Sequence, residues 1–239
     1  MKTMVFLYAM SFIAGCQDSS STSRQDQTLE EIERIETQFQ WGVVSPTMQL
    51  VSETVDPNIC PSGWTRLQEK FEARGERHVL PLQPRYVNRF ANLYEFTRAG
   101  VAARGVLGDL VKTFRLSMVW PCWVGNPLWR SHMAQTIELL QEAGWTVELT
   151  LLHHDSYPAH LHNGDGFSLG GWTRDDTADE FVSYVRSVMS TLEELLPRGT
   201  RVWLANEPIA MLFEGYLNPE GKRPPGGKNA SASLGRALP

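Results

Sequence analysis

Cysteine, excess basic charge and long apolar runs are all scarce in this sequence of 239 residues. Its three cysteines are too few for a scaffold held together by disulfides. Lys and Arg number 22 against 27 Asp and Glu, which gives a formal net charge of −5. Nucleic-acid-binding proteins usually carry a basic excess, so we expect no nucleic-acid partner. No apolar run is long enough to form a permanent transmembrane helix.

The composition is that of a soluble globular protein. Hydrophobic residues make up 42% of the chain, charged residues 21% and aromatic residues 10%. Eight tryptophans are a high number for this length. They favour a protein with an aromatic-lined cleft, although many of these rings could simply belong to the core.

The first 16 residues are typical of an export signal. Met1 and Lys2 precede an apolar run at 5–14, which suits the hydrophobic region of a secretory signal peptide. The small residues before Cys16 resemble the lipobox of bacterial lipoproteins, in which the cysteine is acylated. The alternative is an ordinary signal peptide with an incidental cysteine. We expect a signal peptide at 1–15 and a lipid anchor at Cys16 that holds the protein in the bacterial cell envelope, at the outer membrane or in the periplasm.

Residues 16–37 are expected to link this anchor to the folded body. The segment 17–27 is rich in Ser, Thr, Gln and Asp, as in flexible tethers, and a short helix is expected at 28–36. Export would also place Cys60 and Cys122 in a compartment where they could pair. They could equally stay free, and the sequence does not decide between these states.

The body, residues 38–239, alternates predicted strands with predicted helices. Strands are expected at 39–44, 113–119, 146–152 and 201–205, and helices at 63–73, 86–110, 131–143 and 177–196. This alternation predicts a parallel sheet, as a doubly wound fold or as a (β/α)8 barrel. No glycine-rich phosphate loop follows any of these strands, which argues against the nucleotide-binding, doubly wound form.

Polar residues gather where the predicted strands end, as functional residues do in a barrel. They are Gln49 beyond the first strand, His153, His154 and Asp155 after the third, and Asn206 and Glu207 after the fourth. Arg115 lies inside the second strand, where a cation is hard to explain without a buried carboxylate partner. His160 and His162 are expected to face solvent in a loop.

Five segments in this order resemble glycoside hydrolase family 1, the β-glucosidase-like retaining enzymes. Phe39-Gln40-Trp41-Gly42 through Gln49 is similar to the family's first strand, and 114–121 (FRLSMVWP) to its second-strand motif. The segment 153–158 (HHDSYP) is similar to His-Trp-Asp-Leu-Pro, with His154 in place of the Trp. Gly170-Gly171-Trp172 and Asn206-Glu207-Pro208 match two further family motifs. The resemblance implies a TIM barrel of which the sequence carries about the first four β/α units.

The resemblance also implies roles for individual residues. Glu207 would be the general acid/base, and Asn206 would bond the 2-hydroxyl of the sugar, a contact that strengthens in the transition state. Arg115 would lie beneath the nucleophile and keep that carboxylate ionised. Gln49, His153, His154 and Trp172 would bind a carbohydrate substrate, and no cofactor or metal is implied. Trp120 and Trp123 could also offer stacking faces, although core packing is expected for at least two of these three tryptophans.

The family's nucleophile is missing from this sequence. A retaining glycosidase needs a second carboxylate about 5–5.5 Å from the acid, and in this family it ends the seventh strand in a Thr-Glu-Asn-Gly-like motif. No such motif occurs here. The sequence therefore predicts only the N-terminal half of the barrel, inactive alone. It could be an incomplete record of an enzyme, a truncated product, or a half-barrel that pairs with another chain.

Other interpretations stay open at this point. A carbohydrate-binding half-barrel without turnover would keep Gln49, His153 and Asn206 as a sugar site. A cellulase-like family of the same barrel clan also places Asn-Glu after its fourth strand, but it lacks the Phe-x-Trp-Gly opening. His153, His154 and Asp155 could form a metal cluster, although adjacent histidines diverge and no third ligand follows from the spacing.

Overall fold

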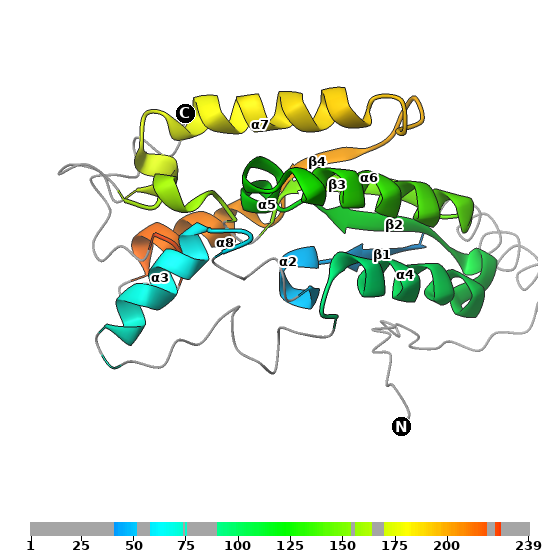
Figure 1. Ribbon diagram of the computed structural model, residues 1–239, viewed down its shortest axis with the longest axis horizontal. Coiled ribbons are helices and arrows are strands. Elements are labelled where there is room, and N and C mark those ends of the chain that lie inside the picture. The colour runs from blue at the N-terminus through cyan, green and yellow to red at the C-terminus, as the bar shows by residue number, and fades with distance from the viewer. Residues whose placement is uncertain are drawn as a thin grey trace, which may run out of the picture. The chain divides into compact units, whose positions relative to one another are not determined.

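The computed structural model (Figure 1) describes residues 41–51, 58–73, 75, 90–153, 156–163, 170–218 and 223–225. The predicted signal peptide, Cys16, the tether and the helix at 28–36 lie outside these residues, as does His154. Within the described ranges, no helix is long and apolar enough to cross a membrane.

The described strands form one parallel sheet, as the sequence predicts. It contains β1 (Trp41–Ser45), β2 (Val111–Ser117), β3 (Thr146–Leu152) and β4 (Val202–Ala205), in the spatial order in which they follow along the chain. Parallel neighbours need a long crossover, and helices supply it here. Because all the strands run the same way, their carboxyl ends meet at one end of the sheet, where α3, α5 and α8 also lie (Figure 1).

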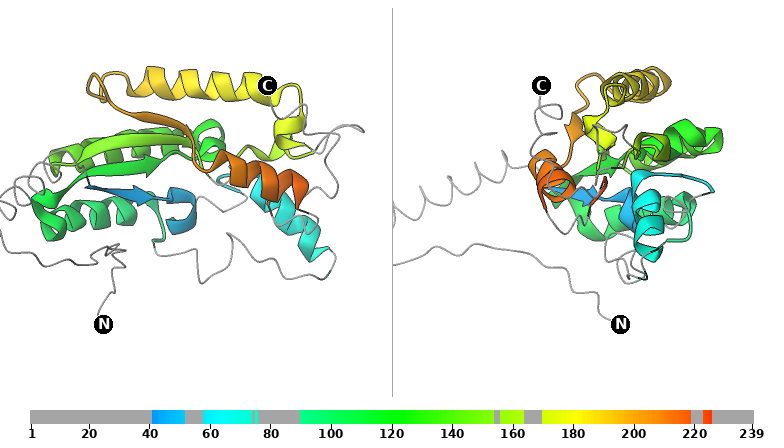
Figure 2. Two further views of the ribbon diagram at one scale, coloured as in Figure 1. Left: turned by 180° about the vertical axis from the view of Figure 1, so that it is seen from behind. Right: turned by 90° about the vertical axis from the view of Figure 1, so that its left-hand side faces the viewer.

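The helices lie along one side of this sheet and at its carboxyl end. They are α2 (Thr47–Leu50), α3 (Gly63–Glu72), α4 (Leu93–Leu107), α5 (Trp120–Gly125), α6 (Pro127–Glu142), α7 (Thr177–Leu192) and α8 (Pro208–Leu212), with 3-10 turns at Gly108–Leu110, Ala159–Leu161 and Gly171–Thr173 and a π-helical turn at Phe213–Leu217. Seen along the strands, α4, α6 and α7 form an arc outside the sheet (Figure 2, right).

Several predicted boundaries are wrong for identifiable reasons. A helix was expected at 86–110, of which residues 86–89 lie outside the described ranges. The helix α4 begins at Leu93, because the Asn92 side chain caps it and the Phe90 amide donates to the Leu50 carbonyl instead. The helix expected from residue 131 already begins at Pro127, after the Asn126 cap. The second strand runs over Val111–Ser117, two residues earlier than expected.

The sheet has two unlike faces. The helix face carries buried apolar side chains that alternate along β2 and β3, namely Phe114, Leu116, Val147, Leu149 and Leu151. Phe114 packs edge-on against Phe96 of α4 and Trp145. The other face, which we call the site face, carries Arg115 of β2 paired in register with Glu148 of β3, and Thr150 paired with Trp203 of β4. Apolar burial against helices therefore stabilises the sheet through its helix face.

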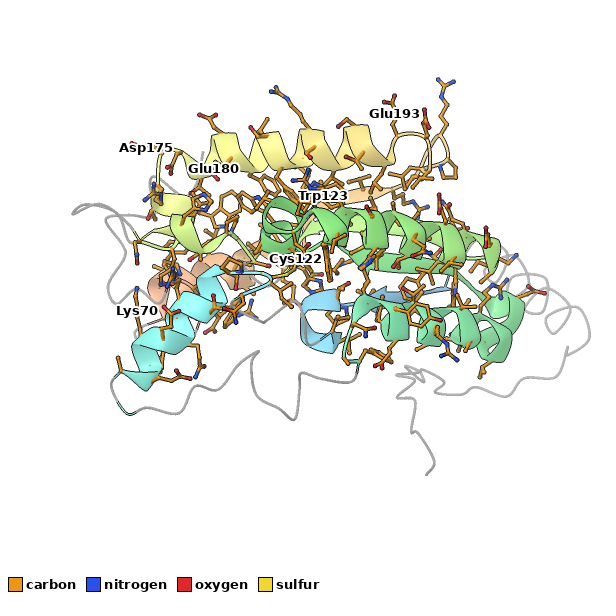
Figure 3. All side chains as sticks on the ribbon, viewed as in Figure 1. Lys70, Cys122, Trp123, Asp175, Glu180 and Glu193 are labelled. Atoms are coloured by element: carbon orange, nitrogen blue, oxygen red, sulfur yellow. A yellow bond between two sulfur atoms is a disulfide. The ribbon has the colours of Figure 1, made fainter. Side chains whose placement is uncertain are left out.

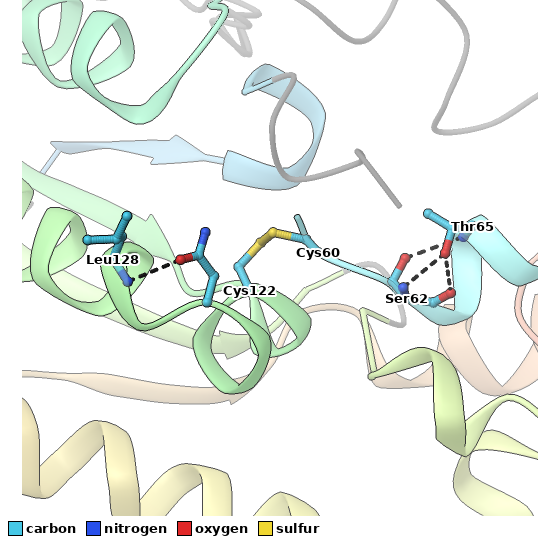
Figure 4. Close-up of a disulfide and its surroundings, with 6 residues drawn as sticks. Cys60, Ser62, Thr65, Cys122 and Leu128 are labelled. Carbon is cyan, nitrogen blue, oxygen red and sulfur yellow. Dashed lines mark hydrogen bonds between the residues drawn. A yellow bond between two sulfur atoms is a disulfide. The ribbon is translucent and has the colours of Figure 1, made fainter. Parts of the chain in front are cut away.

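A disulfide ties the segment before α3 to the helix that follows β2. Cys60 and Cys122, whose pairing the sequence left open, are bonded (Figure 4). Directly after Cys60, Ser62 and Thr65 form a capping box at the start of α3. The Gly63 amide then donates to the Tyr157 carbonyl (2.9 Å), and the Ala159 amide donates to the Pro61 carbonyl (3.0 Å). The start of α3 is thus bonded both to α5 and to the loop that follows β3.

The two histidines of this loop differ. His160 is exposed, as expected, and its Nε2 lies 2.7 Å from the carboxylate of Glu180 at the start of α7 (Figure 3). His162 was expected to face solvent, and this expectation is wrong, because its side chain is fully buried and its Nδ1 shares a hydrogen bond with the Tyr157 hydroxyl (3.3 Å). Burial lowers the pKa of His162 to about 3, with Lys70 and Arg66 adding to the shift.

Candidate active site

Arg115 and Asn206 meet at the carboxyl end of the site face. One guanidinium nitrogen (Nη2) of Arg115 donates to the side-chain oxygen of Asn206 at 2.5 Å. The backbone amide of Asn206 donates to the Leu152 carbonyl (2.9 Å), which continues the β3–β4 pairing beyond the last residue of β4. Side-chain and backbone bonds therefore fix Asn206 from two sides, in the place expected for a residue that grips a ligand above the strand ends.

Arg115 contacts an aromatic ring as well as the Asn206 side chain in the described part of the chain. Its guanidinium carbon lies 5.3 Å from the ring centroid of Trp203, within the range of a cation–π contact. Its Nε is buried and has no hydrogen-bond partner in the described part of the chain. The buried carboxylate partner that we expected for Arg115 does not appear among the described contacts, where an amide and an aromatic face take that place.

Glu207 has an unusual backbone conformation. Its φ of 50° and ψ of 54° are left-handed, and it is the one residue other than glycine with positive φ among those described. For such a residue this conformation costs about 1–2 kcal/mol. Glu207 lies between β4 and α8, and its exposed side chain leaves the strand end next to Asn206. Strain held at a polar residue of this kind is a common mark of a functional position.

His153 is held in one chemical state by its surroundings. It follows β3 directly, is 5% exposed, and shares a hydrogen bond of 2.6 Å between its Nδ1 and the Oγ of Ser117 on β2. Burial lowers its pKa to about 4, with the positive charges of Arg115 and Arg223 adding to the shift. At neutral pH the imidazole is therefore uncharged, so it can both donate and accept hydrogen bonds.

The three tryptophans proposed as stacking faces are mainly packing residues. Trp120 and Trp123 (the latter labelled in Figure 3) are buried, and Trp123 of α5 donates its indole N–H to Ser187 of α7 at 3.0 Å. Trp172 is half-buried against Trp120, and its backbone amide donates to the Tyr216 hydroxyl at 2.6 Å. This bond ties the Gly170-Gly171-Trp172 segment to the π-helical turn that follows α8.

Of two further predicted ligand-binding residues, the structure places the backbone of one. Gln49 belongs to α2, immediately after β1, so its backbone lies at the same end of the sheet as His153 and Asn206. His154 lies outside the described residues. Over the described ranges, no group of three His, Cys, Asp or Glu side chains forms a metal site.

The comparison with family models decides the relationship. The model of glycosyl hydrolase family 1 matches residues 111–237, which is more than half of the chain. The chain belongs to glycosyl hydrolase family 1. The matched region runs from β2 through Asn206 and Glu207, so it contains most of the site described above.

Solved structures of family members share the fold. A double mutant of the β-glucosidase from Trichoderma harzianum is 25% identical, with a TM-score of 0.59 over 82% of this chain and 40% of its own. The β-glucosidase from Thermotoga maritima, in complex with cyclophellitol, is 22% identical, with a TM-score of 0.60. The match covers 83% of this chain and 43% of the β-glucosidase. A family 1 β-glucosidase from Humicola insolens, in complex with glucose, is 23% identical, with a TM-score of 0.58. The match covers 82% of this chain and 38% of that enzyme.

The chain therefore spans less than half the length of these β-glucosidases. Its parallel strands and helices match part of their TIM barrels, which confirms the predicted fold class. No curated protein sequence matches the chain.

Four residues that contact the site escaped the sequence reasoning. Ser117 lay inside the second-strand motif, but nothing indicated that it bonds His153. Trp203 and Tyr216 look like core residues in the sequence. Glu148 was the detectable one, because a carboxylate inside a strand that is expected to be covered on both sides requires a partner.

Proposed function

We propose that this chain forms the sugar-binding and acid/base wall of a retaining β-glycosidase that acts on β-linked glycosides. The observation that carries the proposal is the convergence of Arg115, His153 and Asn206, with Glu207 beside them, at the carboxyl ends of neighbouring strands in a family 1 chain. Amide, imidazole and carboxyl groups are suited to the hydroxyls and the bridging oxygen of a glycoside.

The reaction assigns a different task to each group. In the first step, a nucleophilic carboxylate attacks the anomeric carbon and forms a glycosyl ester, while the acid, Glu207, gives its proton to the departing oxygen. In the second step, Glu207 takes a proton from water, which displaces the ester and releases the sugar with its β-configuration retained. Asn206, oriented by Arg115, would bond the 2-hydroxyl, and the neutral His153, Gln49, His154 and Trp172 would bind the rest of the ring.

This reaction would need a nucleophile that the 239 residues do not supply, because the sequence contains no Glu-Asn-Gly motif of the family type. We propose that the 239-residue chain alone does not hydrolyse glycosides. The alternative is a half-barrel that binds carbohydrate without turnover. The polar groups proposed to bind the sugar lie together in this chain, whereas the motif of the second carboxylate is absent.

The place of action is also a proposal. The N-terminal pattern that ends at Cys16 favours export to the bacterial cell envelope and a lipid anchor there. The bond between Cys60 and Cys122 supports an oxidising compartment, in which disulfides persist. Mass spectrometry of the protein purified from membranes would test the anchor, since a diacylglycerol group on Cys16 is the expected modification.

Glucose binding and hydrolysis, measured on the same chain, test the function. Titration calorimetry should detect glucose binding by the 239-residue chain, and Asn206→Ala and His153→Ala should each weaken it about tenfold, as expected for the loss of one polar contact. His160→Ala, on the exposed side of the same loop, is the matched control. No hydrolysis of 4-nitrophenyl β-glucoside is expected. Unchanged binding in both site variants would contradict the proposed site.

A further inference from the structure

A buried carboxylate on the site face has no role in the chemistry above. Glu148 of β3 is 7% exposed and lies in register with Arg115 on the neighbouring strand. One of its oxygens (Oε2) accepts the indole N–H of Trp203 at 2.9 Å, and the other (Oε1) accepts from Arg201 at 3.1 Å. Both partners belong to the segment that leads to Asn206 and Glu207.

The position is a costly one for a charged side chain. Arg201 is 62% exposed, so this ion pair gives little in return for removing the carboxylate from water. On the helix face of the same strand, Val147 and Leu149 show that apolar residues suit β3. A buried carboxylate bonded to an indole is better explained by the orientation that it imposes than by stability.

Two further contacts connect the bond between Glu148 and Trp203 to the candidate active site. The indole N–H bond to Glu148 fixes the plane of the Trp203 ring, and the Arg115 guanidinium lies over that ring at 5.3 Å. Arg115 then donates to Asn206 at 2.5 Å. Because its Nε has no hydrogen-bond partner in the described residues, the ring face and the Asn206 amide are what orient this guanidinium.

We infer that Glu148 and Trp203 are positioning residues, which orient Asn206 for its ligand through Arg115. Glu148 does not touch the sugar in this scheme. The consequence for sugar binding rests on the proposed function, whereas the positioning itself concerns only the side chains of this chain.

Nuclear magnetic resonance of the full 239-residue chain separates the two claims. The side-chain amide signals of Asn206 are assigned by their absence in Asn206→Asp. Glu148→Leu should shift these signals. Trp203→Phe should also shift them, because it keeps an aromatic ring beneath Arg115 but removes the N–H donor. Glu148→Gln, whose side-chain oxygen still accepts the N–H, should restore the wild-type positions.

Arg201→Gln is the matched control, because it breaks the ion pair of Glu148 and leaves its bond to Trp203. It should leave the Asn206 signals where they are. Glucose affinity should fall about fivefold to tenfold in Glu148→Leu and in Trp203→Phe, with no further loss in the double variant, since both changes break the same bond.

The outcomes are distinct. Unshifted Asn206 signals in Trp203→Phe, or shifts as large in Arg201→Gln, would overturn the positioning role, and Trp203→Phe decides the matter if Glu148→Leu does not fold. Shifted signals in a chain that binds no glucose would leave the positioning role standing and contradict the proposed function.

Discussion

The two faces of the sheet are built from the same strands, but one packs against helices and the other carries the candidate active site. On the helix face, Leu116 and Leu149 are fully buried among apolar neighbours. On the site face, Arg115 and Glu148 stand beside them in the sequence but bond polar groups across three strands. Side chains alternate between the two faces along a strand. Substitutions at neighbouring residues can therefore test the stability of the core and the chemistry of the site separately.

The largest expected effect is on the helix face. Leu149→Ala should lower the free energy of unfolding by about 2–5 kcal/mol, because it leaves a cavity in a packed core. Val44→Ala, on the site face of β1 where the side chain is 50% exposed, should cost less than about 1 kcal/mol. Urea unfolding of both variants measures the contrast, and equal losses would contradict the division between faces.

A pH dependence of intermediate size comes from two buried histidines. The folded pKa values of His153 and His162, about 4 and about 3, lie below the ordinary value of 6.5, so the folded state holds fewer protons than the unfolded state between these limits. The stability that they contribute is complete above pH 6.5 and is lost as the pH falls towards 4 and 3.

Each histidine should contribute a slope of about 1.4 kcal/mol per pH unit within its window. His162→Gln should therefore flatten the pH dependence of urea unfolding between about pH 6 and about pH 5 by roughly half. His160→Gln, which changes the exposed histidine of the same loop, should leave the slope as it is. A slope that is unchanged in His162→Gln would show that this side chain is not buried in its neutral form.

The smallest expected effect is a gain in stability. The free energy of unfolding should be about 0.5–1 kcal/mol higher for Glu207→Gly than for Glu207→Ala, because glycine adopts the left-handed conformation without strain. Thermal unfolding of the two variants gives the difference. If alanine proves as stable as glycine, residue 207 does not hold a left-handed backbone in solution.

The sequence was sufficient where local periodicity and packing agree. The apolar alternation along 146–152 predicted β3 correctly, and Asn206-Glu207-Pro208 was correctly placed at the end of a strand. Boundaries failed where a cap was overlooked, as at Asn92 and Asn126. His162 is buried beside a turn that contacts α3, a helix far earlier in the chain, so no local pattern could reveal its burial.

Long-range contacts of the site were the hardest part to predict. The sequence identified Arg115 and Asn206 as candidates, but their hydrogen bond joins residues 91 positions apart. The carboxylate expected beside Arg115 stays a prediction, and among the described residues an aromatic face lies beside this guanidinium. The neighbouring carboxylate, Glu148, could be identified in the sequence, but it bonds the aromatic ring beside Arg115 rather than Arg115 itself.

The central claim is that Glu207 delivers the proton to the leaving group. Its most direct test is the hydrolysis of aryl β-glucosides of different leaving-group acidity by this chain joined to the nucleophile-bearing half of a family 1 barrel. Glu207→Gln should slow the release of a poorly acidic phenol by about 100-fold or more, and it should slow the release of dinitrophenol far less, because that leaving group needs little protonation. Equal losses on both substrates would contradict the acid/base role.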